Sequence, residues 1–169
     1  MGSGTLFVRD GDAVVGSFAP EYAAVVRGLV SQAGSVLAHP VDRRDPGIAR
    51  LFPDAYRESA DDADEFRRLT ESELRTGKIE SVDTLLATLP EDGGDVRLDP
   101  EQASAWLRAL NDVRLLMGTR LDLTDDTDIT TEVDDEILRD PQSHRLAELV
   151  AYGYLTEVQE SLVLALAAW

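Results

Sequence analysis

Residues 99–121, DPEQASAWLRALNDVRLLMGTRL, carry the strongest helix signal in the chain. Asp99 is a good N-cap, Pro100 suits the first helical turn, and Gln102 can complete a capping box. Apolar residues then recur at three- and four-residue steps, the spacing of one helical face, until Gly118 ends the pattern. They are Ala103, Trp106, Leu107, Leu110, Val113 and Met117. We therefore expect a central helix around which the rest of the chain packs.

The composition is that of one globular domain spanning residues 1–169. Hydrophobic residues make up 43% of the chain and charged residues 29%, and a chain of this length buries roughly two-thirds of its unfolded surface. No apolar run approaches the ~20 residues that span a bilayer. The N-terminal MGSGTLFVRDGD also lacks the features of a secretory signal. These observations predict a cytoplasmic protein without membrane contact.

Two bulk properties exclude whole classes of function. The chain has no cysteine, which removes disulfides, thiol nucleophiles, thiolate metal sites and thiol redox sensing. Its formal net charge is -17. A surface this acidic repels phosphate backbones unless basic residues gather on one face, and it favours basic partners. Direct DNA binding is therefore not expected.

The N-terminal segment predicts a small β-hairpin. Residues 5–10 (TLFVRD) and 13–18 (AVVGSF) read as strands on either side of the turn signal Asp10-Gly11-Asp12. Residues 96–98 form a candidate third strand just before the central helix. Because a lone hairpin is marginal in water, these strands must pack on the helices.

Further helices are expected over residues 21–37, 61–75, 79–89 and 142–168. Gly77 should separate the second of these from the third, and Phe66, Leu69 and Leu74 should face inward. The last helix ends in SLVLALAAW, which is apolar nearly all round and predicts burial in the core or in a partner. The predicted fold class is mainly α: a bundle of about five helices with a small N-terminal β-hairpin.

Residues 122–140 hold nine acidic side chains against one arginine, Arg139. Low hydrophobicity and charge repulsion predict an acidic, mobile loop. The best EF-hand frame begins at Asp122, but it places Thr127 where the loop needs glycine and Val133 where it needs glutamate. A solvated run of charge is therefore favoured over a metal site.

Two groups of polar residues are the candidates for an interaction site. Arg67 and Arg68 could clamp a phosphate, although ion pairs from Asp64 to Arg68 and from Glu71 to Arg75 within one helix are favoured. The second group lies among the apolar residues of the central helix, where a buried network tying that helix to its neighbours is favoured over a binding site. Its members are Asn111, Asp112, Arg114 and Arg120.

No segment forms a recognisable catalytic, cofactor-binding or metal-binding motif. His39 and His144 are far apart and lack metal-ligand spacing, so a surface or capping role is favoured for both. There is no Ser/His/Asp arrangement and no glycine-rich phosphate loop. We therefore expect neither an enzyme nor a bound cofactor.

Several segments together resemble an actinobacterial family of formerly unknown function whose members are called oxidative-stress transcriptional regulators of the AosR type. These are DPGIARLFPDAYRE, DDADEFRRLTESELRTGKIESVDTLLATLP, LDPEQASAWLRALNDVRLLMGTRLDL and YGYLTEVQESLVLAL. The RRLTESELR and WLRALNDVRLLMGTRL runs, in this order and spacing, carry the resemblance most specifically. With the N-terminal hairpin and first helix, the matching segments cover most of the chain.

The resemblance implies a cytoplasmic regulator of oxidative-stress genes that acts through protein contact with a sigma factor or RNA polymerase. Its contact surface would be Arg67, Arg68 and the edge from Asn111 to Arg120, or else the apolar C-terminal helix. Because cysteine is absent, oxidant sensing either lies in a partner or is missing from this member. Two alternatives stay open: a small-molecule-binding protein or enzyme of unknown chemistry, and a structural homodimer built on the C-terminal helix.

Overall fold

A computed structural model describes residues 6–53 and 60–168, with the side chains of residues 60–63 left aside. Its elements are β1 (Phe7–Asp10), β2 (Ala13–Phe18), α1 (Pro20–Ala38), α2 (Pro46–Leu51), α3 (Ala60–Thr88), β3 (Gly94–Leu98), α4 (Pro100–Arg120), α5 (Ile129–Arg139) and α6 (His144–Ala167). The predicted fold class is confirmed, since helices dominate and the N-terminal hairpin forms. The start of the first strand predicted at Thr5 lies outside the described residues.

Helix α4 begins as its sequence predicts. The Asp99 carboxylate accepts a hydrogen bond from the Gln102 backbone N–H at 2.8 Å, and the Gln102 side chain accepts one from the Asp99 N–H at 3.0 Å. This reciprocal pair satisfies two N–H groups that a helix start otherwise leaves open. At the other end, Gly118 does not stop the helix, which continues to Arg120.

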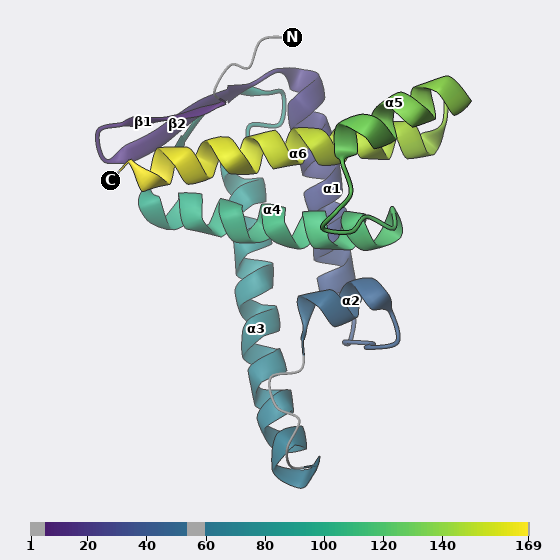
Figure 1. Cartoon of the computed structure of the whole chain (residues 1–169). Helices are drawn as coiled ribbons and strands as arrows, with labels where there is room; N and C mark the ends of the chain where they lie inside the picture. The colour runs from purple at the N-terminus through teal and green to yellow at the C-terminus, as the bar shows by residue number, and fades with distance from the viewer. Residues whose placement is uncertain (1–5, 54–59, 169) are drawn as a thin grey trace.

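The helices are arranged around α4 (Figure 1). In this view α4 and α6 run side by side across the molecule, and α1 and α3 cross behind them. The small sheet lies at the end of α6 where the C-terminus is marked. The short α2 packs near the C-terminal end of α4, and α5 folds back along the start of α6.

The sheet has three antiparallel strands in the order β1-β2-β3, so the candidate third strand is confirmed. Gly16 in β2 pairs with Phe7 on one side and Val96 on the other. A Cβ at Gly16 would lie 2.8 Å from the Phe7 ring and 2.6 Å from the Leu6 carbonyl oxygen. Glycine is therefore required there, because the ring of Phe7 occupies the space beside that backbone.

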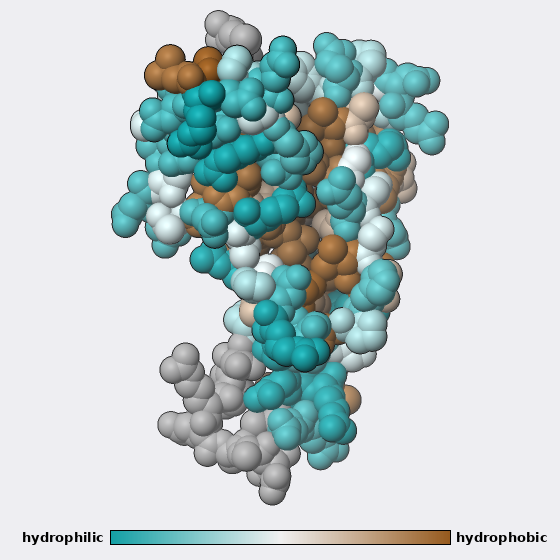
Figure 2. All heavy atoms as spheres, turned by 90° about the vertical axis from the view of Figure 1, so that its right-hand side faces the viewer, coloured by the Kyte–Doolittle hydropathy of each residue, from teal (hydrophilic) through white to brown (hydrophobic). Residues whose placement is uncertain are grey.

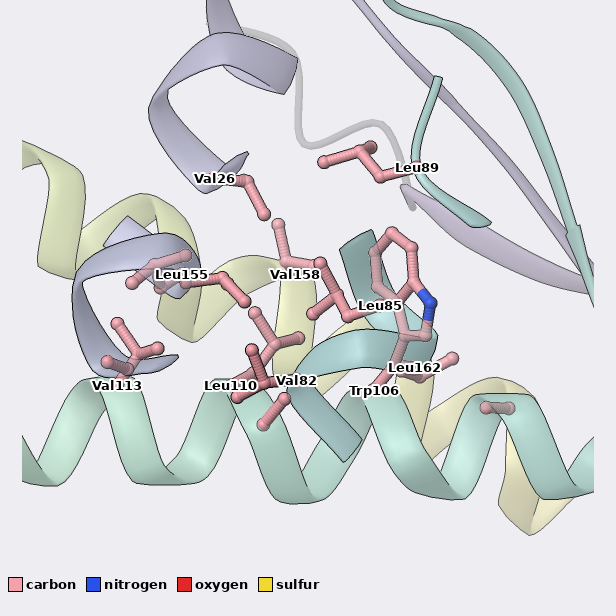
Figure 3. Close-up of a cluster of buried hydrophobic side chains, with 14 of the residues drawn as sticks. Val26, Val82, Leu85, Leu89, Trp106, Leu110, Val113, Leu155, Val158 and Leu162 are labelled. Carbon is pink, nitrogen blue, oxygen red and sulfur yellow. The ribbon is translucent and has the colours of Figure 1, made fainter. Parts of the chain in front are cut away.

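The core is built where α1, α3, α4 and α6 meet. Figure 3 shows their apolar side chains pointing toward one another, with Trp106 and Leu110 of α4 among Val26, Leu85 and Val158. All five side chains are fully buried. The central role predicted for residues 99–121 follows from this position, because α4 contributes to the core along most of its length.

The region predicted as two helices is one continuous helix, α3, and this corrects the sequence interpretation. Gly77 lies inside it, with nothing within 4 Å of the position that a Cβ would take. An internal glycine costs about 1 kcal/mol relative to alanine. The contacts that α3 makes with α1 and α4 on either side of Gly77 compensate for that cost.

The apolar residues of the first half of α3 do not face inward as predicted. Phe66 is 49% exposed, Leu69 63% and Leu74 40%. Figure 1 gives the reason, because this half of α3 extends well beyond α4 and α6. The spacing of the three residues identified a helical face correctly, but it could not show that the helix outruns the core.

The acidic stretch 122–140 was predicted as a loop, but it contains helix α5. Its negative charge is partly neutralised by arginines: Arg145 of α6 binds Glu132 at 3.0 Å, and Arg139 binds Glu136 at 2.8 Å. Glu136 also accepts a hydrogen bond from the Ser143 hydroxyl at 2.8 Å and is only 5% exposed. These partners reduce the repulsion on which the loop prediction rested, and the Asp128 side chain caps the start of the helix.

Helix α6 closes the core with one face only. Leu155, Val158 and Leu162 are fully buried, whereas Val150 is more than half exposed. Near its end the Ser161 hydroxyl accepts a hydrogen bond from the Phe7 backbone N–H at 3.3 Å. The apolar tail therefore closes the core of its own chain along that face and leaves the opposite face on the surface.

We predict that Leu162→Ala lowers the free energy of unfolding by about 2–5 kcal/mol, because it leaves a cavity in the core. The matched control is Leu164→Ala, two residues along the same helix, where the side chain is 67% exposed. Its effect should stay within about 0.5 kcal/mol. Urea denaturation followed by circular dichroism measures both variants. Equal losses would mean that the outer face of α6 is also buried, as in a homodimer.

Candidate functional site

Arg67 and Arg68 lie on the outer half of α3. Arg67 pairs with Asp64 at 3.5 Å, and Arg68 is exposed. Lys78, where α3 meets α4, follows Arg68 by ten residues and so lies about 15 Å further along the helix. The structure therefore does not place the two arginines in one site with the polar residues of α4.

The neighbouring charged residues of α3 bind other segments. Glu71 accepts a hydrogen bond from Arg43, which precedes α2. Arg75 donates to the carbonyl oxygens of Leu37 at 2.6 Å and Ala38 at 2.8 Å, at the end of α1. The structure thus uses Glu71 and Arg75 to attach α3 to distant segments, whereas the sequence predicted a pair between them.

The four polar residues of α4 divide between two sides of the helix. Asp112 points to α3, where its carboxylate binds Lys78 at 2.7 Å. Arg114 and Arg120 point to α6 and bind Gln159 and Glu148 there. Asn111 is exposed on the α3 side. This arrangement ties α4 to both neighbours, as the favoured sequence interpretation described.

The pair of Asp112 and Lys78 is the most deeply buried ion pair among the described residues, with side chains 4% and 15% exposed. Lys78 occupies only one carboxylate oxygen, Oδ1, and the buried Oδ2 has no hydrogen-bond partner. Burial raises the pKa of the Asp112 carboxyl, and the hydrogen bond and charge of Lys78 offset only part of that effect. Asp112 is therefore a carboxylate with unused capacity to accept a hydrogen bond.

Arg114 binds α6 through both of its terminal nitrogens, although among the described residues its buried Nε has no hydrogen-bond partner. Its Nη1 donates to Gln159 at 2.8 Å and its Nη2 to the Tyr152 hydroxyl at 3.4 Å. The guanidinium also lies 5.2 Å from the centre of the Tyr152 ring, within cation–π range. These contacts make Arg114 a structural link between α4 and α6.

A polar groove of about 700 Å³ lies in the corner between α3 and α4, and we call it the acidic groove. Asp112 and Lys78 line it, together with Ser81, which accepts a hydrogen bond from Arg108 at 3.1 Å. The acidic groove carries five carboxylates against two cationic side chains. Its lining residues are Glu73, Leu74, Gly77, Lys78, Glu80, Ser81, Thr84, Asp99, Glu101, Gln102, Ala105, Arg108, Asn111 and Asp112.

A second, apolar hollow of about 420 Å³ lies between α1, α2 and α4. Leu29 and Val36 of α1 and Leu116 of α4 form its walls, with Gln32 and Arg120 among its polar residues. Figure 2 shows the corresponding face, where apolar residues form a strip bordered by polar ones. Its volume and its partly apolar lining fall within the range of small-molecule sites.

Neither histidine lies in these two sites. His39 follows the end of α1 and its Nδ1 is 2.7 Å from the Ser35 carbonyl oxygen, while His144 is exposed at the start of α6. Within residues 6–53 and 60–168, no group of three or more metal-binding side chains is placed to hold an ion. Among the helices of that same part of the chain, none is long and apolar enough to cross a membrane.

Sequence reasoning missed Lys78, Ser81 and Arg108, which complete the acidic groove with Asp112. One signal was available for Lys78, because it is the only lysine in a chain with 16 basic residues. The presence of a single lysine among arginines draws attention to Lys78, but it does not identify Asp112, 34 positions away, as its partner. The pairing became visible only once α3 was known to be continuous through Gly77.

We predict that Asp112→Ala lowers the free energy of unfolding by about 3 kcal/mol, because Lys78 is left as a largely buried charge without its partner. Adding Lys78→Met should recover part of that loss. A matched control is the exposed pair of Arg97 and Asp10, where removing either residue should cost less than about 1 kcal/mol. Chemical denaturation of wild type, Asp112→Ala, Lys78→Met and the double variant measures the coupling between the two residues, and additive losses for Asp112 and Lys78 would contradict it.

Comparison with known proteins identifies the family. A family described as a domain of unknown function, DUF2017, matches residues 3–166. Proteins named oxidative stress regulator AosR from Mycobacterium tuberculosis (strain H37Rv) and Mycobacterium bovis are each 30% identical, over 94% of this chain and 84% of their own length. A Mycobacterium leprae relative carrying the AosR name is 35% identical over 73% of this chain and 59% of its own length. No solved structure matches at a significant level. The chain therefore belongs to the DUF2017 family and is a relative of the mycobacterial AosR proteins.

Proposed function

We propose that this protein is a cytoplasmic, non-enzymatic regulator of the oxidative-stress response that acts through contact with other proteins. The observation that carries the proposal is the 30% identity, over 94% of the chain, to proteins named oxidative stress regulator. The sequence resemblance suggests the transcription apparatus as the partner, through a sigma factor or RNA polymerase. Because the chain has no cysteine, oxidant would be sensed by a partner.

The structure offers a physical basis for a protein-binding role. The outer half of α3 extends from the body of the molecule (Figure 1) and presents Arg68 beside the half-exposed Phe66 and Leu69. Arginine and aromatic side chains are enriched at the centres of protein interfaces. Most of the polar residues of α4, by contrast, are engaged with α3 and α6. We therefore propose the outer half of α3 as the contact surface.

We predict that charge reversal at Arg67 and Arg68 to Glu reduces recovery of a sigma factor or RNA polymerase at least tenfold in a pull-down from the host. The same double variant should abolish the transcript changes that the protein causes after peroxide treatment. Arg44→Glu with Arg50→Glu is the matched control, since both residues are exposed and lie on the α2 side. The amount of sigma factor or RNA polymerase that this control variant recovers should stay within twofold of the wild-type amount.

Thermal unfolding separates a lost contact from a lost fold. If the Arg67 and Arg68 variant melts well below wild type, the arginines are structural and a single Arg68→Glu variant replaces it. The regulatory proposal fails when a deletion strain shows the same peroxide response as wild type and no transcription subunit is captured.

A second candidate function is the binding of a small apolar molecule in the hollow between α1, α2 and α4. The size and the apolar walls of the hollow favour this function. A ligand present at 100 times its dissociation constant adds about 2.7 kcal/mol to stability, so a metabolite panel read by melting temperature detects it. Val36→Trp should fill the hollow and abolish the shift. Val25→Trp, exposed on the same helix, should leave it intact. Absence of any shift across the panel rejects this candidate.

A further inference from the structure

We propose that the acidic groove between α3 and α4 receives an arginine or lysine side chain of a protein partner. The inference rests on the proposed function only in taking a protein as the carrier of that side chain. The centre of the acidic groove, at Lys78 and Asp112, lies about 15 Å along α3 from Arg68, although Glu73 and Leu74 at the end of the outer half reach its wall. Three features of the groove support it.

The first feature is the charge at the edges of the groove. Glu73 and Glu80 of α3 stand on one wall. Glu101 of α4 and Asp99, which caps that helix, stand on the other, and all four are exposed. Carboxylates on two walls attract a cation into the space between them more strongly than carboxylates along one helix. The net charge of -17 adds a long-range attraction for basic proteins.

The second feature is the Asp112 carboxylate in the lining. Its side chain is 4% exposed; Lys78 holds Oδ1, and among the described residues Oδ2 finds no hydrogen-bond partner. A buried carboxylate oxygen without a partner costs free energy. If the carboxylate turns so that Oδ2 meets the groove, an N–H donor brought in by a ligand removes that cost. An incoming guanidinium or ammonium group supplies both the donor and the opposite charge.

The third feature is room for the aliphatic part of a long side chain. Leu74 lines the groove and is 40% exposed. Next to it, Gly77 has no atom within 4 Å of the position that a Cβ would take, so the wall is open there. Arginine and lysine bury their carbon stems on such apolar surface while the charged end reaches a carboxylate. A metal ion would gain nothing from this apolar wall.

The single lysine of the chain provides a direct measurement. Labelling with ¹⁵N-lysine gives one backbone amide signal, from Lys78 in the acidic groove. The probe is the pentapeptide acetyl-Ala-Ala-Arg-Ala-Ala-amide, titrated at 150 mM salt. Its control replaces arginine with citrulline, which has nearly the same shape but no charge. The arginine peptide should shift the Lys78 signal saturably, and the citrulline peptide should shift it at least tenfold less.

Variants test whether the groove itself binds the probe. Glu73→Gln with Glu101→Gln should raise the dissociation constant at least fivefold, and both positions are exposed, so the fold is retained. Asp134→Asn with Asp135→Asn removes the same charge from exposed positions on α5 and should change it less than twofold. Asp112→Asn should weaken binding further than the edge variants.

Three results would overturn the inference: a Lys78 signal that does not respond, an equal response to citrulline, or equal weakening by the α5 control. The last of these would mean that the peptide responds to net charge alone. None of the three bears on the regulatory role, which is tested by the peroxide response of a deletion strain. Conversely, a strain without any peroxide phenotype would reject the regulatory role and leave the peptide result standing.

Discussion

Trp106 must bury a large ring and satisfy one N–H group at the same time, and this double requirement fixes how the sheet meets the helices. Its ring lies 5.6 Å from that of Phe7 and 5.8 Å from that of Phe18, measured between ring centres. Its Nε1 donates to the Thr88 hydroxyl at 2.7 Å, at the end of α3. One side chain of α4 thereby holds β1, β2 and α3 in a common position.

The crossing of α1 and α3 depends on a second kind of constraint, the open carbonyl groups at helix ends. Arg27 of α1 donates to the carbonyl oxygens of Leu86 and Leu89 at the end of α3. In the same way, Arg75 of α3 donates to the carbonyl oxygens of Leu37 and Ala38 at the end of α1. Each helix thus closes the other's C-terminus, where the dipole favours a cation. The crossing is therefore held by charge-assisted hydrogen bonds as well as by apolar packing.

The sequence predicted what local signals control. The capping box at Asp99 and the hairpin around Gly11 depend on residues close in the chain. The third strand was predicted from its own residues, although the strand that it pairs with, β2, lies far earlier in the chain. Sequence reasoning failed where contacts between distant segments contribute: α3 passes through Gly77 with α1 and α4 packed against it, and α5, which Asp128 caps locally, packs on α6 and is tied to it by the pair of Glu132 and Arg145. The acidic groove was not predicted for the same reason, since Lys78 and Asp112 are 34 residues apart.

Internal use of the basic residues changes how the net charge acts at the surface. Five basic side chains bind carbonyl or carboxylate oxygens or other acceptors within the chain: Lys78, Arg27, Arg75, Arg114 and Arg145. Several of the remaining carboxylates, including Glu73, Glu101, Asp134 and Asp135, are exposed. Because these basic side chains are bound inside the chain, they neutralise the exposed carboxylates at the surface only in part. The surface presented to a partner is therefore strongly negative. Such a surface repels the phosphate backbone of an operator and attracts proteins that carry basic segments. The charge distribution therefore favours basic protein segments over nucleic acid as partners, and the acidic groove is the place where we propose that such a segment inserts a basic side chain.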